Sequence, residues 1–150
     1  MRRFRRPTLG LGGLACAALL IATAGLATAA SSGSAADSEL DVVLGKPREF
    51  ALKTSARVGK AGEVEFVVRN MGRITHELIV LRTATRAGNL KPRPEEPSKV
   101  VEPGFQFELE DIEPGDRVTI ALPLKKGHYV LLCNIEGHYA GGMHADLTLR

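Results

Sequence analysis

The chain has 150 residues, enough for one domain of ordinary size with a buried core. Its net charge of +3 comes from 20 basic and 17 acidic residues, and Arg2, Arg3, Arg5 and Arg6 account for the excess, since 16 against 17 remain without them. The nearly neutral remainder gives no reason to expect a nucleic acid as a partner.

Residues 1–30 are typical of an export signal. They combine an arginine-rich start, an apolar run over residues 9–26 and the small residues 27–29, which fit a cleavage site. We expect the rest of the chain to be exported, in the periplasm or elsewhere outside the cytoplasm. The alternative is an uncleaved membrane anchor over residues 9–30, which reach the about 20 residues that span a bilayer. The export route stays open, because the sequence after the twin arginine Arg5 and Arg6 fits a twin-arginine signal poorly.

Residues 31–38 consist of Ser, Gly, Ala and Asp and predict a flexible tether before a domain over residues 39–150. That domain has the pattern of short strands separated by Gly and Pro turns. The continuous apolar run over residues 78–81 predicts a strand buried on both faces, and the proline-containing segment before residue 100 predicts a loop with a helical turn. The expected strands cover residues 40–44, 49–53, 64–69, 78–81, 100–101, 105–109, 118–122, 128–133 and 144–149.

This pattern predicts an all-β fold, a two-sheet antiparallel β-sandwich of Greek-key type. Strand pattern alone does not separate such a sandwich from an immunoglobulin-like domain. The absence of Trp and of a second cysteine in the domain argues against the immunoglobulin type.

Residues 133–143 place a thiol, an imidazole and a thioether at regular intervals. Four residues separate Cys133 from His138, and four separate His138 from Met143. Soft sulfur ligands with imidazole select copper, and two His, one Cys and a long axial Met form the blue-copper electron-transfer arrangement. Such a site requires one more histidine, and His76 is the natural candidate. The sequence therefore predicts a copper site at these four residues.

Cys133 is the only cysteine outside the leader, because Cys16 lies within it, so no intramolecular disulfide is expected. By strand alternation, Tyr129, Leu131 and Cys133 share one face, which predicts that the sulfur points inward. The alternative interpretation of Cys133 is an ordinary buried apolar residue. Alternation also predicts that His128 is exposed to solvent.

The same residues resemble the cupredoxin family. The strand over residues 127–133, the Gly137-His138 step, Gly142-Met143 and the closing strand are similar to the C-terminal half of a cupredoxin. The run over residues 62–70 that leads to His76 is similar to the strand and loop that carry the family's first histidine. The resemblance covers roughly residues 41–150, and the ligand spacing is closest to that of the rusticyanin and sulfocyanin branch.

The resemblance implies a monomer with one copper ion, Cu⁺ or Cu²⁺, per chain. It also implies that Asn70 bridges two ligand loops, although a turn residue is an equal explanation. Glu136 stands where many relatives have proline, and a carboxylate there predicts a lowered reduction potential. The surface around His138, with Tyr139 and Ala140, is a candidate for partner docking.

Two functions remain open. The first is a mononuclear type 1 copper protein that carries single electrons between exported or membrane redox proteins, such as a cytochrome, an oxidase or a reductase. The second is a copper-binding protein for storage, delivery or resistance. An enzyme is not expected, because the chain has only four histidines for additional copper sites.

Overall fold

The computed structural model describes residues 36–150. The predicted leader lies outside these residues, as does most of the predicted tether. Within the described part, β1 begins at Ser38, and Asp37 already pairs with Lys60 (2.5 Å). None of the helices among residues 36–150 has the length and apolar character needed to span a membrane.

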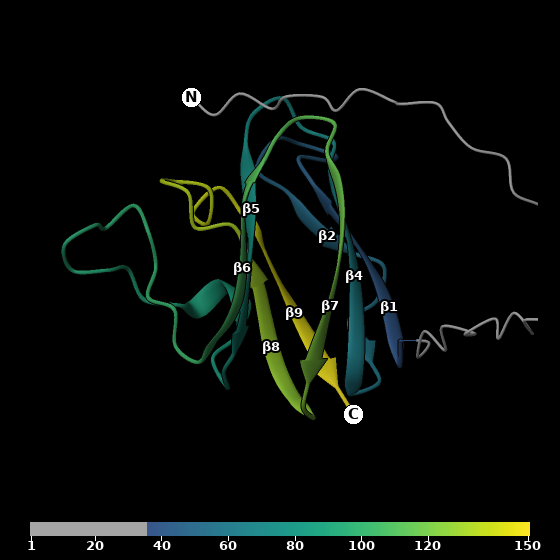
Figure 1. Ribbon diagram of the computed structural model, residues 1–150. Helices are drawn as coiled ribbons and strands as arrows, with labels where there is room; N and C mark the ends of the chain where they lie inside the picture. The colour runs from purple at the N-terminus through teal and green to yellow at the C-terminus, as the bar shows by residue number, and fades with distance from the viewer. Residues whose placement is uncertain (1–35) are drawn as a thin grey trace, which may run out of the picture. The chain divides into compact units, whose positions relative to one another are not determined.

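Two β-sheets pack face to face, as Figure 1 shows. The four-stranded sheet has the order β2-β1-β4-β7, and the five-stranded sheet has the order β3-β9-β8-β5-β6. The strands are β1 (Ser38–Leu44), β2 (Leu52–Thr54), β3 (Val58–Gly59), β4 (Gly62–Asn70), β5 (His76–Arg82), β6 (Phe105–Ile112), β7 (Arg117–Leu124), β8 (Gly127–Leu132) and β9 (His144–Leu149). The nearly all-β sandwich predicted from the sequence is confirmed.

The core lies between the two sheets and follows from strand alternation. In β4, Val64, Phe66 and Val68 are fully buried. Tyr129 and Leu131 of β8 point into the same cluster from the facing sheet. Burying side chains of this size stabilises the fold by about 1.5–3 kcal/mol each. Because protein interiors are closely packed, the sandwich is also a rigid support for its loops.

The prediction of purely antiparallel sheets is wrong for two strand pairs. β1 runs parallel to β4, and β3 runs parallel to β9. A parallel pair requires a long connection, and the chain between β1 and β4 is long enough because it also forms β2 and β3. The sheets are therefore mixed.

The outer face of β5 and β8 carries a second buried cluster. Ile79, Leu81, Val130 and Leu132 pack there against the segment over residues 83–104. This explains why the run over residues 78–81 is buried on both faces, as predicted. The expected helical turn is the 3₁₀ helix η1 (Ala87–Asn89), whereas the expected strand at residues 100–101 is only a bridge between Pro92 and Val100.

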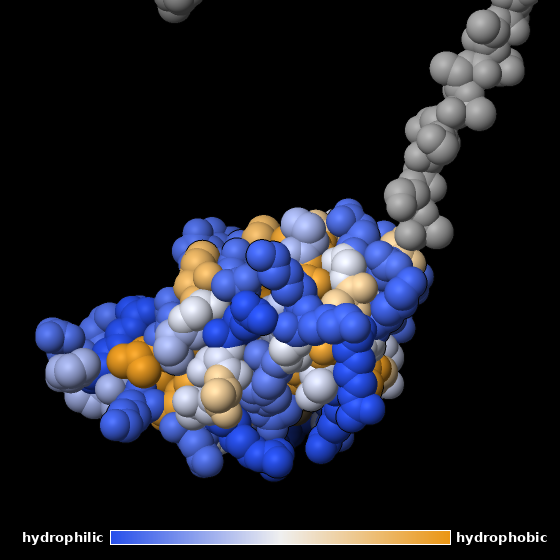
Figure 2. All heavy atoms as spheres, turned by 90° about the horizontal axis from the view of Figure 1, so that it is seen from below, coloured by the Kyte–Doolittle hydropathy of each residue, from blue (hydrophilic) through white to orange (hydrophobic). Residues whose placement is uncertain are grey.

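The two ends of the sandwich differ in the loops that they carry. The loops that follow β1, β4 and β8 lie at one end, drawn at the top of Figure 1. The opposite end, where β8 begins and β9 ends, is mainly hydrophilic, with small scattered apolar groups (Figure 2). The candidate ligands all belong to the first end.

Candidate metal centre

Cys133 follows directly after β8 and points into the core. Tyr129, Leu131 and Cys133 belong to the cluster between the sheets, whereas Val130 and Leu132 belong to the outer cluster. The predicted alternation is therefore confirmed. Cys133 is fully buried, and its thiol is free in the part of the chain that the structure describes.

The loop over residues 133–143 folds back on itself. The carbonyl oxygen of Met143 accepts the N–H of Cys133 (3.0 Å), and the N–H of Met143 donates to the carbonyl oxygen of His138 (3.1 Å). Gly137 and Gly142 have φ values of 78° and 109°, which residues with a side chain rarely adopt. These turns place His138 directly over Cys133.

His76 is the first residue of β5 and is held by the loop before it. The Nδ2 of Asn70 donates to the carbonyl oxygens of Ile74 (2.8 Å) and Ile112 (2.7 Å), and the Oδ1 of Asn70 accepts the N–H of Gly72 (2.9 Å). Asn70 thus links the His76 loop to the end of β6. Within the part of the chain that the structure describes, the Asn70 side chain makes no hydrogen bond to residues 133–143, so the expected bridge between two ligand loops is not formed directly.

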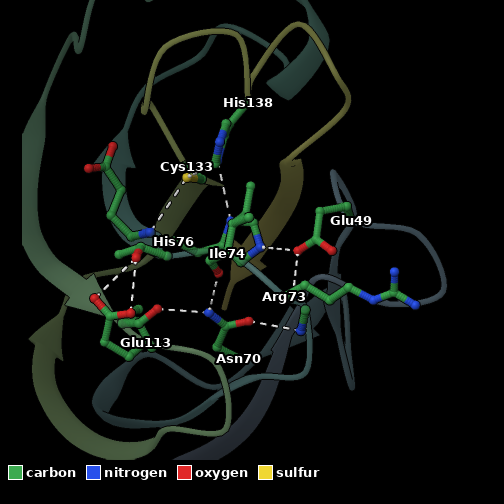
Figure 3. A network of polar contacts seen from close by, with 12 residues as sticks. Glu49, Asn70, Arg73, Ile74, His76, Glu113, Cys133 and His138 are labelled. Atoms are coloured by element: carbon green, nitrogen blue, oxygen red, sulfur yellow. Dashed lines mark hydrogen bonds and ion pairs between the residues drawn. The ribbon is translucent and has the colours of Figure 1, made fainter.

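The three predicted nitrogen and sulfur donors converge (Figure 3). The Nδ1 of His138 lies 3.3 Å from the Nδ1 of His76 and 3.3 Å from the Sγ of Cys133. All three donor atoms lie within 4.8 Å of one another. His76 and Cys133 are fully buried, and His138 is 6% exposed.

These distances fit a metal ion. With bonds of about 2.0 Å to nitrogen and about 2.3 Å to sulfur, the donors of a trigonal site lie about 3.5 Å apart. The chemistry of the set, two imidazoles and one thiol, is the one that copper prefers. The residues present therefore fit the ion that the sequence predicts.

Burial controls the protonation of the three donors. It lowers the pKa values of both His76 and His138, which keeps the imidazoles neutral and able to bind a cation. Burial also raises the pKa of the Cys133 thiol to about 11. Without a cation the site is therefore neutral, and metal binding must displace the thiol proton.

Glu77, next to His76, contacts the Cys133 sulfur through its backbone N–H. Its N–H lies 3.5 Å from the Sγ of Cys133, and its carboxylate accepts the N–H of Asn134 (2.6 Å). Asn134 in turn holds Val100, with bonds to both the N–H (2.8 Å) and the carbonyl oxygen (2.9 Å). This chain of bonds fixes the first residues of the ligand loop.

Met143, the fourth predicted ligand, is fully buried in the same core cluster as Cys133. Its burial is compatible with an axial position. Its binding to a metal stays a prediction.

Two residues that the sequence analysis did not single out complete the site. The carboxylate of Glu49 lies 3.3 Å from the Nε2 of His76, on the side of the ring away from His138 (Figure 3). The ring of Phe50 packs against His138, with 5.0 Å between centroids, and is itself 39% exposed. Both residues were expected in a strand over residues 49–53, but β2 begins only at Leu52.

Two expectations about surface residues change. The hydroxyl of Tyr139 donates to the carbonyl oxygen of Ala87 and accepts the N–H of Leu90 (3.0 Å), so this buried side chain anchors the loop from inside. His128 is partly buried rather than fully exposed, because its Nε2 lies 2.9 Å from Asp146.

No protein-family model matches the sequence, and a search of curated proteins found no match. Solved structures do match in fold. Rusticyanin from Thiobacillus ferrooxidans superimposes with a TM-score of 0.59 and 14% identity, over 77% of this chain and 79% of that one. Auracyanin from Roseiflexus castenholzii gives a TM-score of 0.54 and 19% identity, over 77% and 98% of the two chains. Auracyanin B gives 0.52 and 16%, over 77% and 91%. The chain therefore has the cupredoxin fold.

Proposed function

We propose that this chain is a mononuclear type 1 copper protein that carries single electrons between exported or membrane redox proteins. His76, Cys133 and His138 would hold one copper ion, and the thioether of Met143 would serve as a fourth ligand. The observation that carries the proposal is the buried convergence of two imidazole nitrogens and one thiol. The cupredoxin fold supports the same conclusion.

The residues around the site suit repeated one-electron transfer. Copper supplies the redox couple, and the chain supplies donors whose positions are fixed before the ion binds. His76 and His138 bind as neutral imidazoles, and Cys133 binds as a thiolate after losing its proton. Because the sandwich holds these donors in one arrangement, little reorganisation accompanies a change of oxidation state.

The solved structures support a redox role. One of them is described as the copper protein rusticyanin, and reduced forms of both rusticyanin and auracyanin have been solved. In this chain, the same fold brings two imidazoles and one thiol together.

We place electron exchange at the end of the sandwich that carries the ligands. His138 is almost completely covered, and the exposed ring of Phe50 lies over it. Two further exposed apolar side chains, Met71 and Ile74, belong to the loop that precedes His76. A redox partner would contact these side chains rather than Tyr139, which is turned inward.

Copper storage or delivery is the competing function. A delivery protein must release its ion readily, whereas here Cys133 and His76 are fully buried. Burial of the donors therefore favours the carrier.

A stepwise reductive titration of the copper-loaded protein separates the two functions. A carrier takes up one electron per copper and returns to its starting spectrum on reoxidation, with the copper retained after gel filtration. A protein that loses its copper on reduction, or that accepts no electron, is not a carrier.

A further inference from the structure

The loops that follow β1 and β4 approach each other next to His76, at Gly45 and Gly72. The β1–β2 loop covers residues 45–51, and the β4–β5 loop covers residues 71–75. The N–H of Met71 donates to the carbonyl oxygen of Leu44 (2.9 Å), and a Cβ on Gly45 would lie only 2.4 Å from the Cα of Gly72. A side chain at position 45 would therefore prevent the two backbones from approaching so closely.

The crossing brings a carboxylate to the buried histidine. The Oε1 of Glu49 accepts the N–H of Arg73 (2.8 Å) and lies 3.3 Å from the Nε2 of His76. His76 is fully buried, whereas the Glu49 side chain is 29% exposed.

The Oε1 of Glu49 that accepts the Arg73 N–H is the same atom that faces the Nε2 of His76, and a carboxylate oxygen accepts hydrogen bonds. The Nε2 of His76 must therefore carry the proton of the neutral ring, which leaves a lone pair on Nδ1. That nitrogen is the one that lies 3.3 Å from the Nδ1 of His138, on the side of Cys133. The opposite tautomer would point an N–H into the site and would block a bond to a cation.

We propose that Glu49 is a positioning residue that fixes His76 in the Nε2–H tautomer before copper binds. The inference rests on the proposed function, because it assigns the Nδ1 of His76 as a copper ligand. Its physical basis is a hydrogen bond from the far nitrogen of a ligand histidine to a carboxylate, which sets the ring orientation and raises the basicity of the ligand. Removal of such a partner typically lowers metal affinity by about 10- to 100-fold.

The tautomer can be measured without a metal. Correlation of ring protons with ring nitrogens in the ¹⁵N-histidine-labelled, copper-free protein identifies which nitrogen of His76 carries the proton. We expect the Nε2–H form alone in the natural protein, and a mixture of both forms in Glu49→Ala. The Cu²⁺ affinity of Glu49→Ala, measured by chelator competition, should fall by about 10- to 100-fold.

Gly72→Ala offers a second variant that leaves the carboxylate in place. Its Cβ would lie 2.2 Å from the Oε1 of Glu49 and 3.0 Å from the Nε2 of His76, so the carboxylate and the ring cannot keep their present contact. It should reproduce both effects. Glu113→Gln is the matched control, because Glu113 accepts a hydrogen bond from Thr75 of the β4–β5 loop (3.1 Å) and, among the described residues, makes none with His76. The control should leave the tautomer and the affinity unchanged.

The Nε2–H form alone in Glu49→Ala would overturn the inference. If Glu49→Ala does not fold, Gly72→Ala decides, and the Nε2–H form alone in that variant would then overturn the inference. A mixture of tautomers in Glu49→Ala, combined with a copper complex that lacks a thiolate absorption band, would leave the inference standing and refute the proposed function instead.

Discussion

The backbone N–H of Cys133 donates a hydrogen bond to the carbonyl oxygen of Met143, with a distance of 3.0 Å. The two ends of the ligand loop are thus joined by main-chain atoms, whatever the side chain at position 143. A substitution there can remove the thioether without opening the loop.

We expect Met143→Leu to raise the reduction potential of the copper protein while the visible absorption band persists. Loss of the Met143 sulfur would lower the number of copper ligands, which favours the reduced ion. In blue-copper sites the identity of this weak ligand tunes the reduction potential. The exchange conserves volume in the fully buried position and should cost less than about 1.5 kcal/mol of stability. Voltammetry tests this, and a potential equal to that of the natural protein would show that Met143 is not a ligand.

The two acidic residues near the site should differ in their effect on the potential. Glu136 is exposed, so solvent screens its charge, whereas Glu49 contacts His76. Both carboxylates favour the oxidised ion, and neutralising either should raise the potential. We expect Glu49→Gln to raise it by up to about 59 mV, the equivalent of a tenfold loss of Cu²⁺ over Cu⁺ affinity, and Glu136→Gln by clearly less. The reverse order, or a lower potential in either variant, would contradict this account.

Asn134 should be important for stability. Its side chain satisfies both the N–H and the carbonyl oxygen of the buried Val100. Leaving a buried polar group without a partner costs about 1–3 kcal/mol, so Asn134→Ala should lower the free energy of unfolding by at least about 2 kcal/mol. Urea denaturation of the copper-free protein measures it. Gln106→Ala, which removes only exposed bonds to the backbone, is the control and should change stability by less than about 0.5 kcal/mol.

The copper-free protein should lose stability as the pH falls below the ordinary histidine pKa of 6.5. Burial lowers the pKa values of His76 and His138 in the folded state, so the unfolded chain binds protons first and is favoured by acid. Burial of Glu77 raises its pKa and acts in the opposite sense, but only closer to its ordinary value of 4.5.

Denaturation at about pH 7.5 and about pH 5.5 tests the direction. The difference in the free energy of unfolding between the two pH values should shrink in His138→Gln. A free energy that stays constant over this range, or that rises on acidification, would contradict the assignment of buried neutral imidazoles.

The sequence predicted the part of the site that is local in the chain. Cys133, His138 and Met143 lie in one short loop, and their residue types and spacing alone predict a copper site. The alternation in β8 also predicted correctly that Cys133 points inward. His76 could be found because copper chemistry required a second imidazole and the family resemblance marked its loop.

The rest depends on tertiary contacts that leave no periodic signal. Glu49 reaches His76 only because two loops approach at Gly45 and Gly72, and no pattern in either loop encodes that crossing. The parallel pairing of β1 with β4 was missed for a similar reason, since strand direction in a sheet is fixed by long connections rather than by the strand residues.

The absorption spectrum of the copper-loaded protein tests the central claim most directly. With Cys133 bound as a thiolate beside two histidines, we predict an intense visible band from thiolate-to-copper charge transfer that is absent in Cys133→Ser. A colourless copper complex, or a band that survives in Cys133→Ser, would contradict the account.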